Sequence, residues 1–432
     1  MQRRQFLGAV LGFPMIVPAR ALGRAGAVAP SDKIVMGMIG VGGMGSGHVR
    51  GFLQQPDVRV VAICDVRKEA RDKARDMVDA RYGDKGCATY NDFRELLART
   101  DIDAVMIATP EHWHALIGIE AARRGKHMYY EKPIGVSVAE AKAIREAVKR
   151  YGVVFQLGTQ QRSDRAYRHT CELILNGRIG ELKTVMIGSA GGNRGPRIPE
   201  EPAQKPPEGF DYDMWLGPAP WVDYTPERVS RTWMMIHDYG LGCLSGAWGI
   251  HDVDIAQWVA GCDDTTPIET EATGLFYDDI RDVAYSWTAE HRYANGVRVI
   301  HMDLETAKKR AQQFHFGGMA SVMFGTEGWI YVSRQGMRTH PERLMHEIIK
   351  PHEKKVIKSD NHRRNFLDAI RTRQQPISNI DAAAHGEMVC QQADIAMRLG
   401  RKLRWDPVKE EFVDDPEANR MLARSMRSPW RL

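Results

Sequence analysis

Short apolar runs alternate with amphipathic segments along the first third of the chain. Each apolar run has the length and residue types of a buried strand, and the segments between them carry apolar residues at helical spacing. The expected strands are 34–39, 58–64, 103–108, 127–130 and 153–157, and the clearest helices are 68–81 and 138–150. Strands and helices that alternate in this way predict a parallel α/β sheet, with ligands at its carboxyl edge.

A glycine-rich loop follows the first apolar run. Gly40, Gly42 and Gly45 give the spacing Gly-x-Gly-x-x-Gly, Gly43 and Met44 lie within it, and helical spacing begins directly afterwards. A strand, a glycine turn and a helix start in that order are the context of a dinucleotide-binding loop. Free N–H groups at the helix start suit a pyrophosphate. We therefore predict a Rossmann domain over residues 31–157.

The second apolar run ends at Asp65, twenty residues after Gly45. A carboxylate at this place can accept hydrogen bonds from the adenosine ribose hydroxyls. Arg67 could meet a 2′-phosphate, but Asp65 would repel one. The pair favours NAD and leaves NADP as the alternative.

Polar side chains also follow the later strands of the predicted sheet. Parallel strands bring their carboxyl ends to one edge, so we expect these residues to border the nucleotide. They are Thr109, Pro110, His114, Glu131 and Lys132.

The rest of the chain has a different pattern. Runs with β character at 284–291, 297–304, 319–324 and 329–332 predict an α+β domain, residues 158–351, with an open, mostly antiparallel sheet. A Gly- and Pro-rich loop at 191–220 lies in this domain before these runs, and loops of this length are often functional. We expect residues 352–432 to form helices that return to the first domain, followed by a tail.

Composition and charge remove several classes of function. The 432 residues suggest two domains, and no apolar stretch is long enough to span a membrane. The net charge is +5, but the first 25 residues contribute four arginines and no acid, which leaves +1 for the remainder and no basic excess for nucleic acid. Six cysteines without paired spacing predict neither disulfides nor a metal site.

Residues 1–30 have the pattern of an export signal. Arg3 and Arg4 precede a short apolar stretch, residues 6–17, and a small-x-small site at 19–21 follows. A basic amphipathic N-terminus is the alternative. A twin-arginine signal predicts recognition by the twin-arginine export machinery, export in the folded state and a periplasmic or other extracytoplasmic location. A cofactor would then be acquired in the cytoplasm and held tightly.

The twin-arginine start, residues 238–242 and residues 249–251 resemble the exported branch of the Gfo/Idh/MocA (glucose–fructose oxidoreductase, inositol dehydrogenase) family. Four further motifs resemble the family as a whole. They are the glycine loop, Asp65, the 108–114 segment and Glu131-Lys132-Pro133. The resemblance implies that Lys132 is the active-site lysine beside the nicotinamide and the substrate hydroxyl. It also implies that Pro133 lies in a turn that often has a cis bond, and that the second sheet forms a homo-oligomer interface.

The segment around His251 is similar to the catalytic segment of the same family. The resemblance makes His251 the catalytic base, with an ordinary histidine pKa suited to neutral pH. The acid that the family places four residues earlier falls on Ala247 here, so the usual triad is incomplete. Asp238 or Asp252 could replace it. Further expected substrate contacts are Gln160, Arg162 and Trp215.

These features predict an NAD(P)-dependent oxidoreductase that moves a hydride from a sugar, glycoside or polyol hydroxyl to nicotinamide. One alternative is a glycosidase or epimerase that oxidises its substrate transiently with a retained NAD. The Tyr-Pro-Thr-His segment associated with the N-acetylgalactosaminidase members is absent from the sequence. A second alternative is a sugar-binding protein without catalysis.

Overall fold

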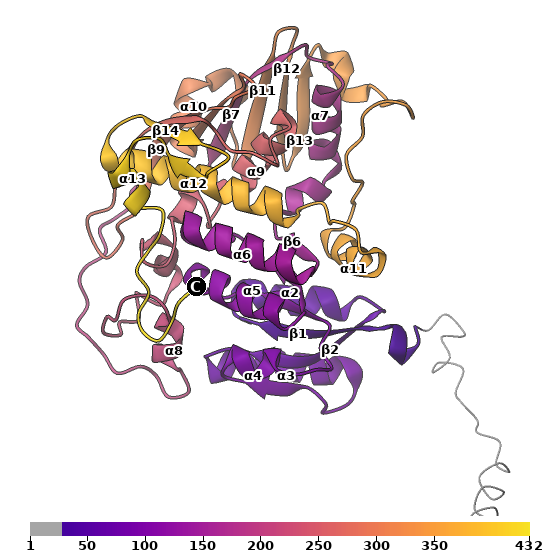
Figure 1. The fold of residues 1–432 in the computed structure, drawn as a ribbon, viewed down its shortest axis with the longest axis vertical. Helices are drawn as coiled ribbons and strands as arrows, with labels where there is room; N and C mark the ends of the chain where they lie inside the picture. Colours follow the sequence, from indigo (N-terminus) through magenta and orange to yellow (C-terminus); the bar gives the residue numbers. More distant parts are fainter. Residues whose placement is uncertain (1–27) are drawn as a thin grey trace, which may run out of the picture.

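The computed structural model describes residues 28–432, which form two sheets with helices around and between them (Figure 1). The first sheet is parallel and has the strand order β3-β2-β1-β4-β5-β6. Its strands are β1 (Ile34–Ile39), β2 (Val58–Cys64), β3 (Ala88–Tyr90), β4 (Ala104–Ile107), β5 (His127–Tyr130) and β6 (Phe155–Leu157). This is the Rossmann-like arrangement that the alternating pattern predicts.

The helices of this domain include the two predicted at 68–81 and 138–150. They are α2 (Gly43–Leu53), α3 (Lys68–Tyr82), α4 (Phe93–Leu97), α5 (His114–Arg123) and α6 (Val138–Tyr151), with short 3-10 turns η2 (Pro30–Asp32) and η3 (Glu111–Trp113). Ser137 caps α6 by accepting a hydrogen bond from the Glu140 N–H, and Gly152 ends that helix in the left-handed conformation. The pattern missed β3 and α4, since three and five residues are too short to show a period.

The second sheet has nine strands in the order β13-β12-β11-β7-β10-β9-β8-β14-β15. Only the β7–β10 pair is parallel, so the sheet is mixed but mostly antiparallel, as predicted. Its strands are β7 (Leu182–Ser189), β8 (Glu269–Phe276), β9 (Ala284–Arg292), β10 (Arg298–Asp303), β11 (Ala320–Gly325), β12 (Trp329–Ser333), β13 (Gly336–His340), β14 (Leu403–Asp406) and β15 (Glu411–Phe412).

Helices and 3-10 turns connect and cover these strands. They are η4 (Gln160–Ser163), α7 (Arg165–Leu175), α8 (Tyr212–Leu216), η5 (Arg231–Met235), η6 (Gly242–Leu244), α9 (Gly249–Ala260), α10 (Leu304–Arg310), η7 (Gln312–Phe314), η8 (Glu342–His346), α11 (His362–Thr372), α12 (Ile380–Leu399) and α13 (Pro416–Arg420).

The C-terminal segment joins the two halves. Phe366 and Leu367 of α11 are fully buried in the core of the first domain. Helix α12 packs against α6 on one side and against α9 and β8 on the other, so it is buried along most of its length (Figure 1). The tail was expected to hold helices only. It also adds β14 and β15 to the second sheet, because Leu403 and Trp405 are buried there.

The predicted export signal falls almost wholly on residues 1–27, which lie outside the described residues. Within residues 28–432 no helix has both the length and the apolar character needed to cross a membrane. The six cysteines all belong to this part of the chain and are free thiols.

Candidate functional site

A cavity of about 1190 Å³ lies at the carboxyl edge of the parallel sheet. Its walls come from the loops after β1, β2, β4 and β5, from the segment before α9, and from His251 within α9. Ordinary ligand pockets measure roughly 300–1,000 Å³. The volume therefore suits a ligand in two parts, such as a dinucleotide together with a substrate.

The glycine loop forms one wall of this cavity. Gly40 has a φ of +77°, and a Cβ on Gly45 would lie 1.9 Å from the Gly40 carbonyl oxygen, so both positions need glycine. A Cβ on Gly42 or Gly43 would meet no protein atom within 4 Å. Helix α2 begins at Gly43 and leaves its first N–H groups without intrahelical partners. The loop is thus an open cradle of the kind that fits a pyrophosphate.

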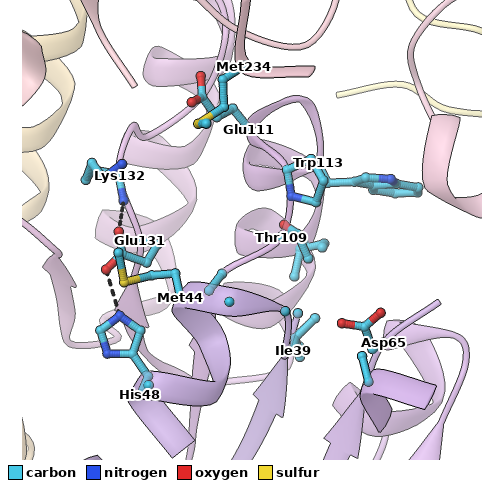
Figure 2. Close-up of a pocket in the computed structure, with 18 of the residues that line it drawn as sticks. Ile39, Met44, His48, Asp65, Thr109, Glu111, Trp113, Glu131, Lys132 and Met234 are labelled. Carbon is cyan, nitrogen blue, oxygen red and sulfur yellow. Dashed lines mark hydrogen bonds and ion pairs between the residues drawn. The ribbon is translucent and has the colours of Figure 1, made fainter. Parts of the chain in front are cut away.

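Asp65 stands at the far end of the cavity, at the tip of β2 (Figure 2). Its carboxylate accepts hydrogen bonds from the Val41 N–H at 2.8 Å and the Arg67 N–H at 2.9 Å. Burial raises its pKa, while these two hydrogen bonds act in the opposite direction. The hydrogen bonds fix the carboxylate beside the cradle, where a ribose would lie.

Arg67 also borders the cavity, but its guanidinium is engaged elsewhere. It donates to the Val229 carbonyl at 3.3 Å and lies 4.4 Å from the centre of the Phe210 ring. Both partners belong to residues 207–235, which we call the covering segment.

The covering segment runs from the second domain along the nucleotide side of the first (Figure 1). The Lys68 N–H donates to the Gly209 carbonyl at 2.8 Å, and the Asp211 N–H donates to the Val66 carbonyl at 3.0 Å. Asn91 donates to the Asp211 carboxylate at 2.7 Å. Seven of its residues line the cavity, namely Met214, Trp215, Val229, Ser230, Arg231, Trp233 and Met234. A nucleotide in the cradle would therefore lie beneath this segment.

The loops after β4 and β5 are tied together by His114. Its ring nitrogens lie against the carbonyl oxygens of Thr109, at 2.9 Å, and Pro133. His114 is buried and is not part of the cavity wall, so its role is to position Thr109, Pro110 and Lys132, which are. The Lys132–Pro133 peptide bond is cis, as the resemblance implied.

Glu131 is a buried carboxylate in the wall of the cavity. Its Oε1 lies 2.7 Å from Nε2 of His48, a residue that the sequence analysis did not single out (Figure 2). Burial alone would raise the pKa of Glu131, but the hydrogen bond and charge of His48 and the charge of Lys132 outweigh it and lower the pKa to about 2. Glu131 therefore keeps a negative charge next to Lys132.

Lys132 and His251 line the same cavity although they come from different domains. The Lys132 ammonium donates a hydrogen bond to the Gly246 carbonyl, five residues before His251. Nδ1 of His251 is buried without a hydrogen-bond partner. Burial, with Lys132 next in importance, lowers the pKa of His251 to about 3. The imidazole is therefore neutral at physiological pH, and the expectation of an ordinary histidine pKa is corrected.

Glu111 is a cavity residue that the sequence analysis did not select. It is 3% exposed, and its Oε2 has no hydrogen-bond partner. Burial raises its pKa to about 8. The available signal was its position, four residues after the end of β4. Trp113, also missed, lines the cavity with its indole against Trp430 of the tail.

Two of the five residues expected to contact substrate line the cavity, Gln160 and Trp215. Arg162 instead lies buried against the carboxylates of Asp254, at 2.8 Å, and Asp263, at 2.6 Å. Asp252 is buried and accepts a hydrogen bond from Ser189 at 2.8 Å. Asp238 is exposed outside the cavity wall. Neither aspartate replaces the acid missing at Ala247, and Arg162 has a packing role.

Comparisons with known proteins agree with this arrangement. A model of an oxidoreductase family's NAD-binding Rossmann fold matches residues 34–159, and a model of the same family's C-terminal alpha/beta domain matches residues 199–432. The uncharacterized oxidoreductase YrbE of Bacillus subtilis is 31% identical over 235 residues, which are 54% of this chain and 56% of YrbE. The alpha-N-acetylgalactosaminidase of Shewanella oneidensis is 36% identical over 141 residues, 31% of each chain. The chain thus matches about half of the length of YrbE and about a third of the length of the galactosaminidase.

Solved structures show the same fold at low identity. Scyllo-inositol dehydrogenase from Lactobacillus casei, with bound NAD(H) and scyllo-inositol, is 17% identical with a TM-score of 0.59. Aldose-aldose oxidoreductase from Caulobacter crescentus, complexed with glycerol, is 18% identical with a TM-score of 0.61. Each match covers 86% of this chain and 99% of the other. From the two domain matches and this shared architecture, the chain belongs to the Gfo/Idh/MocA oxidoreductase family.

Proposed function

We propose that this protein is an NAD-dependent oxidoreductase that transfers a hydride from a hydroxyl-bearing carbon of a sugar, glycoside or polyol. One observation carries the proposal. A single cavity contains the open glycine cradle and Asp65 at one end and Lys132 with His251 at the other. The first pair of features suits a dinucleotide, and the second suits a substrate hydroxyl.

The side chains divide the work as follows. Gly42 and Gly43 leave room for the pyrophosphate, and Asp65 receives the ribose hydroxyls. Bound NAD supplies the hydride acceptor. Lys132 holds the substrate oxygen and stabilises the negative charge that develops on it. His251 faces the same space, and its neutral imidazole can accept a hydrogen bond from the substrate hydroxyl. Gln160 and Trp215 contribute further substrate contacts.

We propose NAD in preference to NADP, and tight retention of the cofactor. The guanidinium of Arg67 is held by Val229 and Phe210, and Asp65 is a carboxylate neighbour that a 2′-phosphate would disfavour. The covering segment is hydrogen-bonded to the β2–α3 loop that would border the adenosine. Release of the nucleotide would require these contacts to open.

A second candidate function is a glycosidase or epimerase that oxidises its substrate transiently and shows no net redox change. The 36% identity over 141 residues to the Shewanella alpha-N-acetylgalactosaminidase favours keeping it. Retained NAD suits this chemistry, because the same cofactor returns the hydride. The third candidate is a sugar-binding protein without catalysis. The presence of Lys132 and His251 in one cavity argues against it.

We also propose export by the twin-arginine route to an extracytoplasmic location, and a homo-oligomer formed through the second sheet. Residues 3–21 carry the first proposal, and the family resemblance carries the second. Fractionation of cells that produce the full chain tests the location. Light scattering coupled to size exclusion tests the oligomer, and a monomer across micromolar concentrations would exclude it.

The experiment that tests the function starts with protein purified without added nucleotide. Absorbance in the reduced-nicotinamide band is recorded while myo-inositol, simple aldoses and aryl glycosides are supplied in turn. We expect stoichiometric reduction that stops when the retained NAD is consumed. Glycoside turnover without net reduction selects the second candidate. Absence of bound nucleotide together with no NAD affinity would sink every reading based on the cradle.

Variants of the two candidate catalytic residues complete this experiment. Lys132→Ala and His251→Ala should each reduce turnover by about 10²–10⁴-fold. NAD affinity should stay within a few-fold of the wild-type value, because neither side chain belongs to the cradle. Loss of NAD binding in either variant would show that its role has been misassigned.

A further inference from the structure

A second carboxyl group lies against the substrate end of the cavity, in addition to Glu131. We propose that Glu111 is a catalytic residue of this site and exchanges a proton with the substrate hydroxyl that Lys132 holds. The inference rests on the proposed function and deepens it by assigning the proton. It accounts for chemistry that the position four residues before His251 cannot supply, since that position is Ala247.

Space for the Glu111 carboxylate is built into the chain by two glycines. A Cβ on Gly246 would lie 2.0 Å from Glu111 Oε1, and a Cβ on Gly240 would lie 2.5 Å from Oε2. Any side chain at either position would displace the carboxylate. The segment of residues 240–246, which we call the seat, therefore leaves space for the Glu111 carboxylate.

The same seat brings Glu111 to Lys132. Gly246, which the Glu111 carboxylate touches, is the residue whose carbonyl accepts the Lys132 hydrogen bond. Ala247 and His251 line the cavity with them. Figure 2 shows Glu111 and Lys132 on the side of the cavity away from Asp65. An oxygen bound at the Lys132 ammonium would thus lie in the same part of the cavity as the side chains of Glu111 and His251.

Glu111 has an unused polar atom at this place. Its Oε2 is buried without a partner, and a buried acceptor left unpaired is destabilising. Other buried glutamates in the described chain have partners, such as Glu140 with the Val136 N–H and Glu387 with Ser245, whereas Asp394 also has one unpaired oxygen, Oδ1. A substrate hydroxyl would satisfy Oε2.

The surroundings leave Glu111 able to exchange its proton near neutral pH. Burial raises its pKa to about 8, and Glu387 of α12 acts in the same direction. Lys132 and Arg424, on the β5 loop and the tail, act in the opposite direction. The nearby Cys243 thiol stays protonated, since burial raises its pKa to about 11. The positive ring of oxidised NAD would shift Glu111 further toward the carboxylate, which is the form that accepts a proton.

The resulting step is balanced. The carbinol C–H bond breaks and its electron pair leaves as hydride to the nicotinamide ring of NAD. The O–H bond breaks, a C=O bond forms, and the proton goes to the Glu111 carboxylate. His251, with its much lower pKa, then serves as a hydrogen-bond partner that orients the substrate. The reverse step returns the proton from the Glu111 carboxylic acid.

The test compares Glu111→Gln with Glu140→Gln, a buried glutamate of α6 outside the cavity. Difference infrared spectra of wild type minus Glu111→Gln are recorded from about pH 6 to pH 9, with and without NAD⁺. We expect a protonated-carboxyl band that disappears near the pKa of about 8 and at lower pH when NAD⁺ is bound. If no such band is present at the acid end, Glu111 is not the proton carrier. This readout needs no substrate.

Activity gives the second readout. Glu111→Gln should lower kcat by about 10²–10⁴-fold and leave NAD affinity unchanged. It should also remove the pH-dependent limb of the plot of kcat against pH. Glu140→Gln should lower stability but keep the limb. Ala247→Asp added to Glu111→Gln should restore at least about tenfold of the rate, since it returns a carboxyl to the same wall. Wild-type kcat and an unaltered pH profile in Glu111→Gln would overturn the proposal while leaving NAD binding, and hence the proposed function, intact.

If Glu111→Gln does not fold, Glu111→Asp keeps the acid with one methylene fewer. We expect its infrared band to persist and its kcat to fall, because the shorter side chain no longer reaches the hydroxyl. An Asp variant with full activity and no titrating band would count against the proposal.

Discussion

Three charged side chains that follow strands of the parallel sheet have different roles in the structure. Lys132 and Glu111 face the cavity, whereas Arg162 is withdrawn into the second domain, where it is 1% exposed between Asp254 and Asp263. A sequence motif shows that a charge is present near a sheet edge. It does not show whether an acid 92 or 101 residues away will pair with that charge.

The packing role of Arg162 gives a prediction about stability. Arg162→Leu leaves Asp254 buried without its cation, so we expect a loss of about 3–5 kcal/mol in the free energy of unfolding. Arg168→Leu is the matched control, since its partner Asp360 is exposed, and it should cost less than about 1 kcal/mol. Urea unfolding of both variants measures the difference. If Arg162→Leu has normal stability and a raised KM, Arg162 contacts the substrate and does not have a packing role.

At the scale of elements, the strand–glycine–helix unit and the covering segment differ in how they are specified. The first is local, because β1, its turn and α2 are consecutive and the turn requires glycine at positions 40 and 45. The second depends on the Arg67–Phe210 bridge and the Lys68–Gly209 hydrogen bond between distant parts of the chain. No hydrophobic period reports such contacts, so the sequence showed only a long loop.

The covering segment predicts slow release of the nucleotide. Phe210→Ala removes the ring beneath Arg67, a contact worth about 0.5–2 kcal/mol, so NADH should dissociate about 2- to 30-fold faster. Trp221→Ala, in the same segment but exposed and outside the cavity wall, should leave the rate unchanged. Stopped-flow fluorescence of NADH release measures both rates. Equal rates in the two variants would mean that the segment does not hold the nucleotide.

At the scale of the whole molecule, burial shifts many ionisable groups in opposite directions. It lowers the pKa of six histidines to about 3 or 4, namely His112, His127, His251, His291, His301 and His362. It raises the pKa of four carboxyls to about 7 or 8, namely Glu111, Glu140, Asp252 and Glu387. Both sets are held neutral in the folded protein.

These shifts predict a maximum of stability near pH 6.5. Below that pH the unfolded chain binds protons on the six histidines, and these outnumber the four carboxyls that bind protons more tightly in the fold, so stability falls as the pH drops. Above it, the carboxyls are ionised in the unfolded chain but still protonated in the fold, so stability falls as the pH rises toward 8. Thermal unfolding of the nucleotide-free protein across this range measures the curve. A Tm that rises steadily from pH 6.5 to 8 would contradict these assignments.

The sequence by itself determined the local features of this protein. Each buried strand of the first sheet except β3, the glycine loop, Asp65 and Lys132 could be predicted, because a strand, a turn and a helix start leave their pattern within a few dozen residues. The tertiary structure decided which distant groups meet. In the structure Arg162 and Asp252 are buried outside the cavity wall, and the Glu111 carboxylate lies between Gly240 and Gly246. Residues 207–235 lie beside the nucleotide cradle. These outcomes depend on burial and pairing across long stretches of chain, which the order of residues does not display.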